Sequence, residues 1–261
     1  MFSILTAADP ERFAYLPEWM REWLEELVAE FTLNFIKDDR WLYIVKGLWT
    51  TLKVTFFAVL LGIALGVVCA IIRSTYDKLV TDMNKGFGKA VLSIFNTIVN
   101  LYLTIIRGTP VVVQLMIAYF VIFASSKNKV LVAILAFGIN SGAYVAEIIR
   151  SGIMSIDNGQ FEAGRSLGFN YVQTMAYIII PQAFKNVLPA LANEFIVLLK
   201  ETSVSGYIGL EDMTKGGDII RSRTYSAFMP LIAVALIYLV IVIFFSKLVS
   251  LLERRLRNSE R

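Results

Sequence analysis

Three ionisable residues lie inside stretches that are otherwise free of charge: Arg107, Glu147 and Glu194. A charged side chain costs roughly 2.5–3.5 kcal/mol at the centre of a membrane helix on insertion scales, so each of them indicates a functional site or a buried partner. A structural interpretation is equally open. Arg107 could mark the cytoplasmic interface, and Glu194 could satisfy a neighbouring helix. Glu147 could pair with Arg150, three residues further along the same helix.

Other kinds of chemistry are excluded by composition. The chain has no histidine and a single cysteine, Cys69, within an apolar run. Histidine-based acid–base catalysis, histidine-ligated metal sites and an intrachain disulfide are therefore ruled out. A Walker-type phosphate-binding sequence is also missing, because the glycine-rich residues 86–90 lack its spacing and its hydroxyl. We expect no catalytic residue, no metal site and no bound cofactor, so ATP would have to be hydrolysed by another chain.

The overall composition is that of a membrane protein. Hydrophobic residues make up 57% of the 261 residues and the mean hydropathy is +0.65, above the roughly 45–50% apolar content of soluble domains. The net charge is +4. The basic residues flank apolar segments and form no continuous basic stripe, so they fit the positive-inside rule and indicate no binding of nucleic acid.

The elements that position the charged residues are predicted to be about five membrane-spanning helices, which makes the fold all-α and polytopic. The expected spans are residues 54–72, a segment that begins near 90, is interrupted at 108–110 and ends near 124, then residues 130–150, 176–199 and 224–246. If the interrupted segment counts as one crossing, the basic connection that follows the first span lies on the cytoplasmic side, as the positive-inside rule favours. Lys127 and Lys129 then fall on the outer side, against that rule. Residues 200–223 are too polar to span and are expected to form an outer loop.

Three regions follow from these boundaries. Residues 1–45 form an extracytoplasmic or interfacial amphipathic leader, residues 46–252 the membrane domain and residues 253–261 a basic cytoplasmic tail. The leader has an apolar stripe at helical spacing opposite a row of glutamates. The stripe consists of Trp19, Met20, Trp23, Leu24, Leu27, Val28 and Phe31. A packing or anchoring role is favoured for this helix, and a docking surface for a partner is the alternative.

Residues 157–181 are predicted to form a helix, a turn and a second helix on the cytoplasmic face. Apolar residues recur at helical spacing, Gly168 is the expected break, and Glu162 is expected to pair with Arg165. Alternatively, Glu162 could cap the start of the short helix, where the helix dipole favours a carboxylate. The candidate residues of this loop are Gln160, Glu162, Ala163, Gly164, Arg165, Gly168 and Pro181.

The spacing of Glu162-Ala163-Gly164, Gly168 and Ile178–Pro181 resembles the coupling-loop motif of the permease subunits of binding-protein-dependent ABC importers. Gly164 and Ile180 stand where that family usually has alanine and leucine. Further matches narrow the resemblance to permeases for polar amino acids, with the type I importer fold. These are Arg107–Pro110 with Gln114, Ser141–Tyr144 followed by Ala146-Glu147, Gly159-Gln160 and Leu199–Ser203. The resemblance extends over roughly residues 49–252, and several spaced motifs in order are more specific than any one of them.

The resemblance implies a permease of the bacterial inner membrane that pairs with a second permease, identical or different. Two ATPase subunits, which use ATP and Mg²⁺, would bind the coupling loops, and an extracytoplasmic binding protein would deliver the substrate. The N-terminus would lie outside and the C-terminus in the cytoplasm. Two other functions remain open: an ion-coupled secondary transporter, with Glu147 as the titrating group, and a membrane scaffold that transports nothing.

For an amino-acid substrate the resemblance suggests a route through the membrane. Glu147 or Glu194 would bind the α-ammonium group, and backbone N–H groups freed at Gly108 and Thr109 would bind the α-carboxylate. Arg107 also lies at this interruption. The expected neutral lining consists of Gln114, Asn140, Tyr144 and Asn193. Which amino acid is carried is not specified by these residues.

Overall fold

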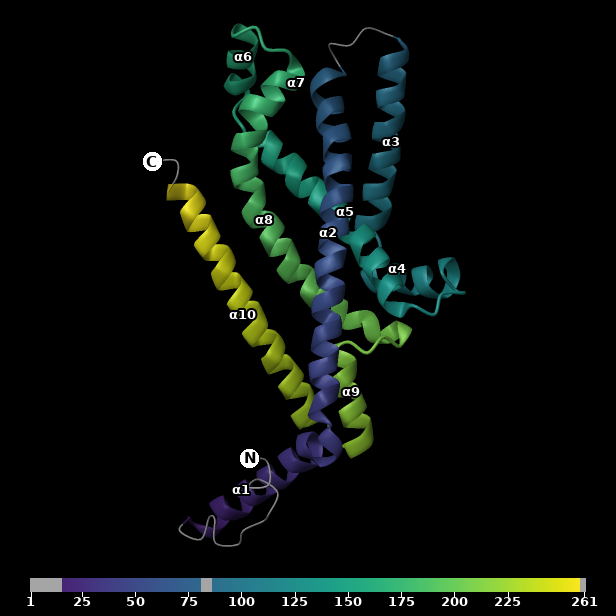
Figure 1. The fold of residues 1–261 in the computed structure, drawn as a ribbon, viewed down its shortest axis with the longest axis vertical. Helices are drawn as coiled ribbons and strands as arrows, with labels where there is room; N and C mark the ends of the chain where they lie inside the picture. The colour runs from purple at the N-terminus through teal and green to yellow at the C-terminus, as the bar shows by residue number, and fades with distance from the viewer. Residues whose placement is uncertain (1–15, 81–85, 259–261) are drawn as a thin grey trace.

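The structure, a computed structural model, describes residues 16–80 and 86–258. No strand forms among these residues, and five helical segments are long and apolar enough to cross a membrane, which confirms the all-α polytopic prediction. Figure 1 shows them as an elongated bundle. The spanning segments are α2 (Trp41–Leu79), α3 (Phe87–Arg107), α5 (Lys129–Met154), the continuous stretch Tyr171–Ile208 that contains α8 (Ile180–Glu201), and α10 (Phe228–Asn258).

The longest helix, α2, forms the axis of the bundle. Its 39 residues correspond to roughly 58 Å, well beyond the hydrocarbon thickness, and the predicted span of residues 54–72 is its middle part. It packs most extensively against α5. Gly62 and Gly66 of α2 lie so close to α5 that an added Cβ would collide with Ser141 and Val145, respectively. The small residues thus bring two helices of one chain together.

The second crossing differs from the prediction. The interruption at Gly108–Pro110 is present, but α3 alone, with 21 residues, is the membrane-spanning helix. At about 1.5 Å per residue it already covers the hydrocarbon. After the break come only α4 (Val111–Ile117) and a short π-helix (Ala118–Ile122). Proline fixes φ and donates no hydrogen bond, so Pro110 starts a new helix. Figure 1 shows α4 turned away from the direction of α3.

The expected outer loop of residues 200–223 is also wrong in part, because it contains a 3-10 helix (Thr202–Ile208) and α9 (Met213–Thr224). Asp212 caps α9 by accepting hydrogen bonds from the backbone N–H groups of Thr214 and Lys215, each at 3.1 Å. Gly47 of α2 lies directly against the backbone of Asp212. Burial raises the pKa of the Asp212 carboxyl to about 6. Capping and close packing together stabilise a helix that periodicity alone did not indicate.

One of the two lysines that oppose the positive-inside rule has a structural partner. Lys129 begins α5, and its ammonium group donates a hydrogen bond of 2.9 Å to the carbonyl oxygen of Gly209. Gly209 ends the 3-10 helix in the left-handed region, with φ +68°. A cation near a helix C-terminus is favoured by the exposed carbonyl groups there, which explains a lysine at this side of the bundle.

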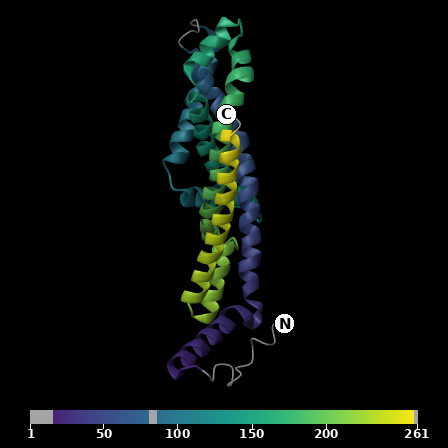
Figure 2. The same ribbon diagram turned by 90° about the vertical axis from the view of Figure 1, so that its left-hand side faces the viewer.

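The leader forms α1 (Glu18–Phe31), followed by a π-helix (Thr32–Ile36) and a 3-10 turn (Lys37–Asp39). The helix was predicted, but α2 starts at Trp41, so the boundary expected after residue 45 falls inside a helix. Figures 1 and 2 show α1 lying across one end of the bundle. The helices α6 and α7 lie at the other end, and α10 ends on their side. The basic tail continues α10 to Asn258.

Candidate functional site

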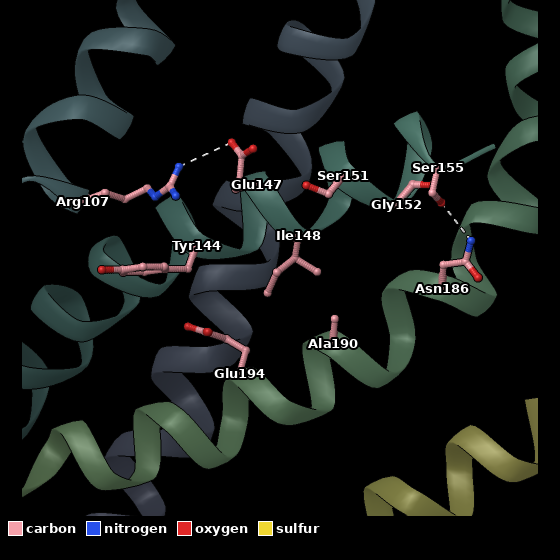
Figure 3. A pocket seen from close by; sticks show the side chains of 10 residues that line it. All are labelled: Arg107, Tyr144, Glu147, Ile148, Ser151, Gly152, Ser155, Asn186, Ala190 and Glu194. Atoms are coloured by element: carbon pink, nitrogen blue, oxygen red, sulfur yellow. Dashed lines mark hydrogen bonds and ion pairs between the residues drawn. The ribbon is translucent and has the colours of Figure 1, made fainter. Parts of the chain in front are cut away.

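A cavity of about 500 Å³ lies where the end of α3 meets α5 and α8. Figure 3 shows the ten side chains that line it. They are Arg107, Tyr144, Glu147, Ile148, Ser151, Gly152, Ser155, Asn186, Ala190 and Glu194. Four of the predicted substrate-path residues are therefore brought together, including all three of the intramembrane charges.

Glu147 projects from α5 and is paired with two arginines. One carboxylate oxygen lies 3.0 Å from Arg150, and the other lies 3.5 Å from Arg107. Arg150 also reaches Asp77 of α2 at 3.4 Å. The guanidinium of Arg107 lies 5.8 Å from the centre of the Tyr144 ring, within the range of a cation–π contact. The structural interpretation of Glu147, a pair with Arg150, is thus present in the structure, and Arg107 extends it into a network.

Glu194 has different surroundings, although it points into the same cavity from α8 (Figure 3). Its exposed fraction is 7%, and it accepts a hydrogen bond of 2.8 Å from the hydroxyl of Ser141. Within the described residues no cation forms an ion pair with it. A buried carboxylate is costly in a membrane interior unless it is protonated or paired with a cation, and the Ser141 hydroxyl offsets only part of this cost.

Gln114 connects the two sides of the break between α3 and α4. Its side-chain amide donates to the carbonyl oxygens of Ile106 at 2.7 Å and of Thr109 at 3.0 Å. In turn its amide oxygen accepts a hydrogen bond of 3.0 Å from Asn140. These two predicted lining residues therefore brace the break and do not line the cavity. The N–H of Gly108 is already bonded to the carbonyl oxygen of Thr104 at 3.0 Å, so it is not free for a carboxylate as expected.

Asn193 does not line the cavity either, since its side chain is exposed on another face of α8. Sequence reasoning overlooked three polar residues that do, namely Ser151, Ser155 and Asn186, and it also overlooked Ser141 as the hydrogen-bond partner of Glu194. A signal for them exists. Asn186, Ala190 and Glu194 recur every four residues, as do Glu147, Ser151 and Ser155. Residues at this spacing share a helix face.

The loop at the far end of the bundle has the predicted form of helix, turn and helix. The Asp157 side chain caps α6 (Asn158–Ser166) by accepting the N–H of Gly159 at 2.6 Å. Gly168 then turns the chain in the left-handed region, with φ +79°. A reciprocal pair of hydrogen bonds between Asn170 and Gln173 starts α7 (Tyr171–Thr174). Because Asp157 is the cap, the capping alternative for Glu162 fails: Glu162 is exposed in the middle of α6.

The inner face of this loop is packed against the membrane helices. Gly164 is buried, and a Cβ there would lie 2.7 Å from Thr174, which explains glycine in place of the alanine usual in the motif. The Lys78 ammonium at the end of α2 donates to Asn158 at 2.9 Å and lies 4.2 Å from the centre of the Phe161 ring. Gln160 accepts from Gln182 at 3.3 Å. Glu162, Ala163 and Arg165 are exposed on this loop.

The start of the following helix accommodates the last loop residue. Pro181 is the second residue of α8, and because helical residues precede it, its missing N–H donor interrupts the hydrogen-bond pattern of a continuous helix. A π-helical stretch (Met175–Ile179) leads from α7 into α8 without a loop. The predicted loop is thus rigidly continuous with the helix that carries Glu194.

Comparison with known proteins places this geometry in a family. Residues 86–258 match the profile of binding-protein-dependent transport system inner membrane components. A putative glutamine transport system permease protein of Rickettsia typhi is 38% identical over 218 residues, which are 82% of this chain and 93% of that protein. An arginine transport system permease protein of Bacillus subtilis is 36% identical and covers 84% of this chain and 94% of its own length.

Solved structures agree with the fold. The crystal structure of an amino acid ABC transporter with histidines is 44% identical, with a TM-score of 0.72 over 82% of this chain and 94% of that one. The MetNI methionine ABC transporter in inward-facing conformations is 19% identical, with a TM-score of 0.70 over 84% of this chain and 98% of its own. At that identity the second likeness supports the fold alone.

Family membership defines the class of the protein and its general partners. Permeases of this class work with a separate ATP-binding subunit and a substrate-binding protein. The match covers most of the chain, and the relatives exceed 30% identity over more than three quarters of it. The chain therefore belongs to the family of binding-protein-dependent transport system inner membrane components, and is a multi-pass permease subunit of an ABC transporter.

Proposed function

We propose that this permease imports a polar amino acid, working as a pair of permease subunits with two ATPase subunits on the cytoplasmic side. The ATPases would bind and hydrolyse ATP with Mg²⁺, and an extracytoplasmic protein would deliver the substrate. The names of the relatives, which are glutamine and arginine permeases, support a polar amino acid. Whether the two permeases are identical is a matter for mass determination of the purified complex.

The observation that carries the proposal is the cavity with opposite charges on its two sides. Glu194 is buried, has no cationic partner among the described residues and would bind the α-ammonium group of the substrate. Arg107, part of the wall on the Glu147 side, would bind the α-carboxylate. Arg107 replaces the backbone groups expected at the break, since the Gly108 N–H is occupied. The polar residues Ser151, Ser155 and Asn186 extend the lining away from these charges.

The exposed face of α6 would be the docking surface for the ATPase. Glu162 and Arg165 are both exposed there, and a pair of opposite charges favours a complementary surface. Since α6, α7 and α8 are linked without a flexible loop beyond Gly168, a movement of the ATPases would be transmitted to α8. The cavity residue Glu194 would move with that helix.

An ion-coupled secondary transporter is the second function to test. In that case Glu147 would have to release and bind protons, yet its carboxylate already has Arg107 and Arg150 as cationic partners. This arrangement supports a structural charge and disfavours a proton carrier. A scaffold that transports nothing would leave the buried Glu194 without a purpose.

Uptake in reconstituted vesicles separates the three functions. We expect labelled arginine or glutamine to accumulate only when the permease is reconstituted with its ATPase, ATP and the binding protein. Accumulation driven by an ion gradient alone would show a secondary transporter, and no accumulation under either condition would show a scaffold.

We further infer that α1 lies outside and that α10 ends in the cytoplasm, because an odd number of spans separates them. In a Cys69→Ser background, Glu25→Cys should react with an impermeant thiol reagent in intact cells. Asn258→Cys should react only after permeabilisation. Labelling of both from outside would contradict this orientation.

A further inference from the structure

The leader helix α1 has an apolar stripe that no described residue covers. Trp19, Trp23, Leu27 and Phe31 follow one another at intervals of four residues and therefore share one helix face. Trp19 is 68% exposed and Trp23 is 57% exposed. This region lies outside residues 86–258, which match the family, so family membership gives it no role.

The junction behind α1 fixes its direction relative to the membrane helices. Asn34 is fully buried, donates to the carbonyl oxygen of Glu30 at 2.8 Å and accepts from the hydroxyl of Thr224 at the end of α9, also at 2.8 Å. Phe35 packs in a core cluster with Met213 of α9 and Val234 of α10. A helix held at its C-terminal end by buried hydrogen bonds and core packing is a rigid extension of the bundle.

A second buried contact completes this junction. The Arg40 guanidinium, only 8% exposed, donates to the carbonyl oxygen of Leu33 at 2.7 Å and pairs with Asp38 at 2.9 Å. Asp38 and Asp39 both have positive φ, which makes the sharp corner between the leader and α2. Helix α1 consequently lies across the end of the bundle in both views (Figures 1 and 2).

Aromatic side chains at the same end of the spanning helices show where the membrane surface lies. Trp41 and Trp49 are exposed on the first turns of α2, and Tyr225 and Phe228 are exposed where α10 begins. Tryptophan and tyrosine concentrate at membrane–water interfaces because their rings are apolar and their N–H or O–H groups bind water. Helix α1 adjoins this end of the bundle in both views (Figures 1 and 2).

We propose that α1 is an interfacial helix whose stripe of Trp19, Trp23, Leu27 and Phe31 inserts into the headgroup region of the bilayer. Its partner is lipid, and its glutamates face the water. Only the choice of the outer leaflet depends on the proposed orientation of the transporter. The insertion itself is independent of substrate and of ATP.

The charge of the helix predicts which lipid it prefers. Interfacial helices commonly have lysine and arginine on the polar face and bind anionic lipids. Here Arg21 and four glutamates, Glu18, Glu22, Glu25 and Glu26, lie around the polar side, and a fifth, Glu30, lies at the edge of the stripe. Insertion is therefore driven by the apolar stripe, should be strongest on zwitterionic lipid and should weaken as anionic lipid is added.

Tryptophan fluorescence in bilayers tests the proposal on the full chain. A Trp41→Phe and Trp49→Phe background leaves Trp19 and Trp23 as the reporters, because the chain has four tryptophans. In phosphatidylcholine vesicles we expect blue-shifted emission that is quenched more strongly by lipids brominated near the headgroup than by lipids brominated near the chain end. Replacing part of the lipid by phosphatidylglycerol should reduce this quenching.

A matched control moves the reporter to the other side of the same helix. Glu25→Trp, which lies roughly 120–160° around the helix from Trp19 and Trp23, combined with phenylalanine at positions 19, 23, 41 and 49, should emit as in water and show little quenching by either lipid. Equal quenching of both reporters would contradict an oriented helix.

Two further results would overturn the proposal. Trp19 and Trp23 could be shielded from water only when binding protein is added, with no quenching by brominated lipid. That result would show that the stripe is a protein-docking surface. The emission could also be blue-shifted without binding protein and remain unquenched by brominated lipids. That result would show that the two tryptophans are buried against protein, either in the same chain or in a second copy. None of these readouts needs transport, so either result would leave the proposed import function untouched.

Discussion

Glu147 and Glu194 line the same cavity but are stabilised in opposite ways. Glu147 is held by Arg150 at 3.0 Å and Arg107 at 3.5 Å, and its side chain is 28% exposed. Glu194 is buried and has a single serine hydroxyl as its side-chain partner among the described residues. The first carboxylate is paired with two cations of the protein, whereas the second has no cation among the described residues, and we propose that the substrate supplies one.

This difference shows that an intramembrane charge is not by itself a sign of substrate binding. Burying each carboxylate costs free energy, and this cost is offset in different ways. The ion pairs around Glu147 compensate its charge permanently. Glu194 would be compensated only while a cationic group occupies the cavity. We therefore assign Glu194 to recognition and Glu147 to positioning Arg107.

The largest expected effect follows from removing the Glu194 charge. Glu194→Gln keeps the size and the hydrogen bond to Ser141 but loses the attraction for an ammonium group. Hydrogen bonds to charged groups contribute about 1.5–3 kcal/mol, so we expect ATP-driven uptake at low substrate to fall roughly 10- to 100-fold. The complex should still assemble, as gel filtration with the ATPase would show. Uptake at the wild-type rate would exclude Glu194 from recognition.

The helix–turn–helix of residues 157–181, which we propose as the ATPase-coupling loop, should fail in another way. Gly168 has φ +79° and open space where a Cβ would lie, so only its backbone conformation restricts the residue. Gly168→Val should be strained by about 1–2 kcal/mol and should lower uptake several-fold while leaving substrate affinity unchanged. Gly168→Asn is the matched control, since asparagine tolerates this conformation. If valine and asparagine gave the same uptake, the turn would not matter for coupling.

The loop and the cavity also differ in how far sequence predicts them. The loop was predicted well because its signals are local: Gly168 breaks the helix, and Asn170 and Gln173 cap the next one within four residues. The cavity bond between Ser141 and Glu194 joins residues 53 positions apart. No helical periodicity reports such a contact.

The same distinction explains the errors in the fold. Helix α9 depends on its Asp212 cap, which is local, and on the close approach of Asp212 to Gly47 of α2, which is a tertiary contact. The second crossing was misplaced because two apolar runs flank Arg107, and hydropathy does not say which one spans. The number of spans was predicted correctly from length and apolar content.

A smaller effect is expected for Glu147, and on stability more than on recognition. Both of its ion pairs are partly exposed, so each contributes about 0.2–1 kcal/mol. Glu147→Gln should lower the thermal midpoint of the permease slightly and reduce uptake by about the same small factor. A double-mutant cycle with Arg150→Gln measures the coupling. Additive effects of the two changes would show that the pair does not stabilise the fold.

The smallest effect on transport is expected at Asp212, a buried carboxylate outside the cavity. Its folded-state pKa is about 6, above the ordinary value of 3.8, because of burial. The folded state then holds a proton more tightly than the unfolded state, so its contribution to stability is present below about pH 4 and is lost as the pH rises through 6. Asp212→Asn should flatten this decline in thermal unfolding and leave uptake nearly unchanged. A pH profile identical to that of the wild type would contradict the assignment.

Protection of a cysteine in the cavity tests the central claim most directly. Ala190 lines the cavity one helical turn before Glu194. In a Cys69→Ser background, labelling of Ala190→Cys should slow when substrate-loaded binding protein and ATP are added to the assembled transporter. A cysteine at Val172, exposed on the coupling loop, is the control for general conformational effects. We predict that Glu194→Gln abolishes the protection and that Glu147→Gln retains it; equal protection in both variants, or its loss in both, would contradict the division of roles between the two carboxylates.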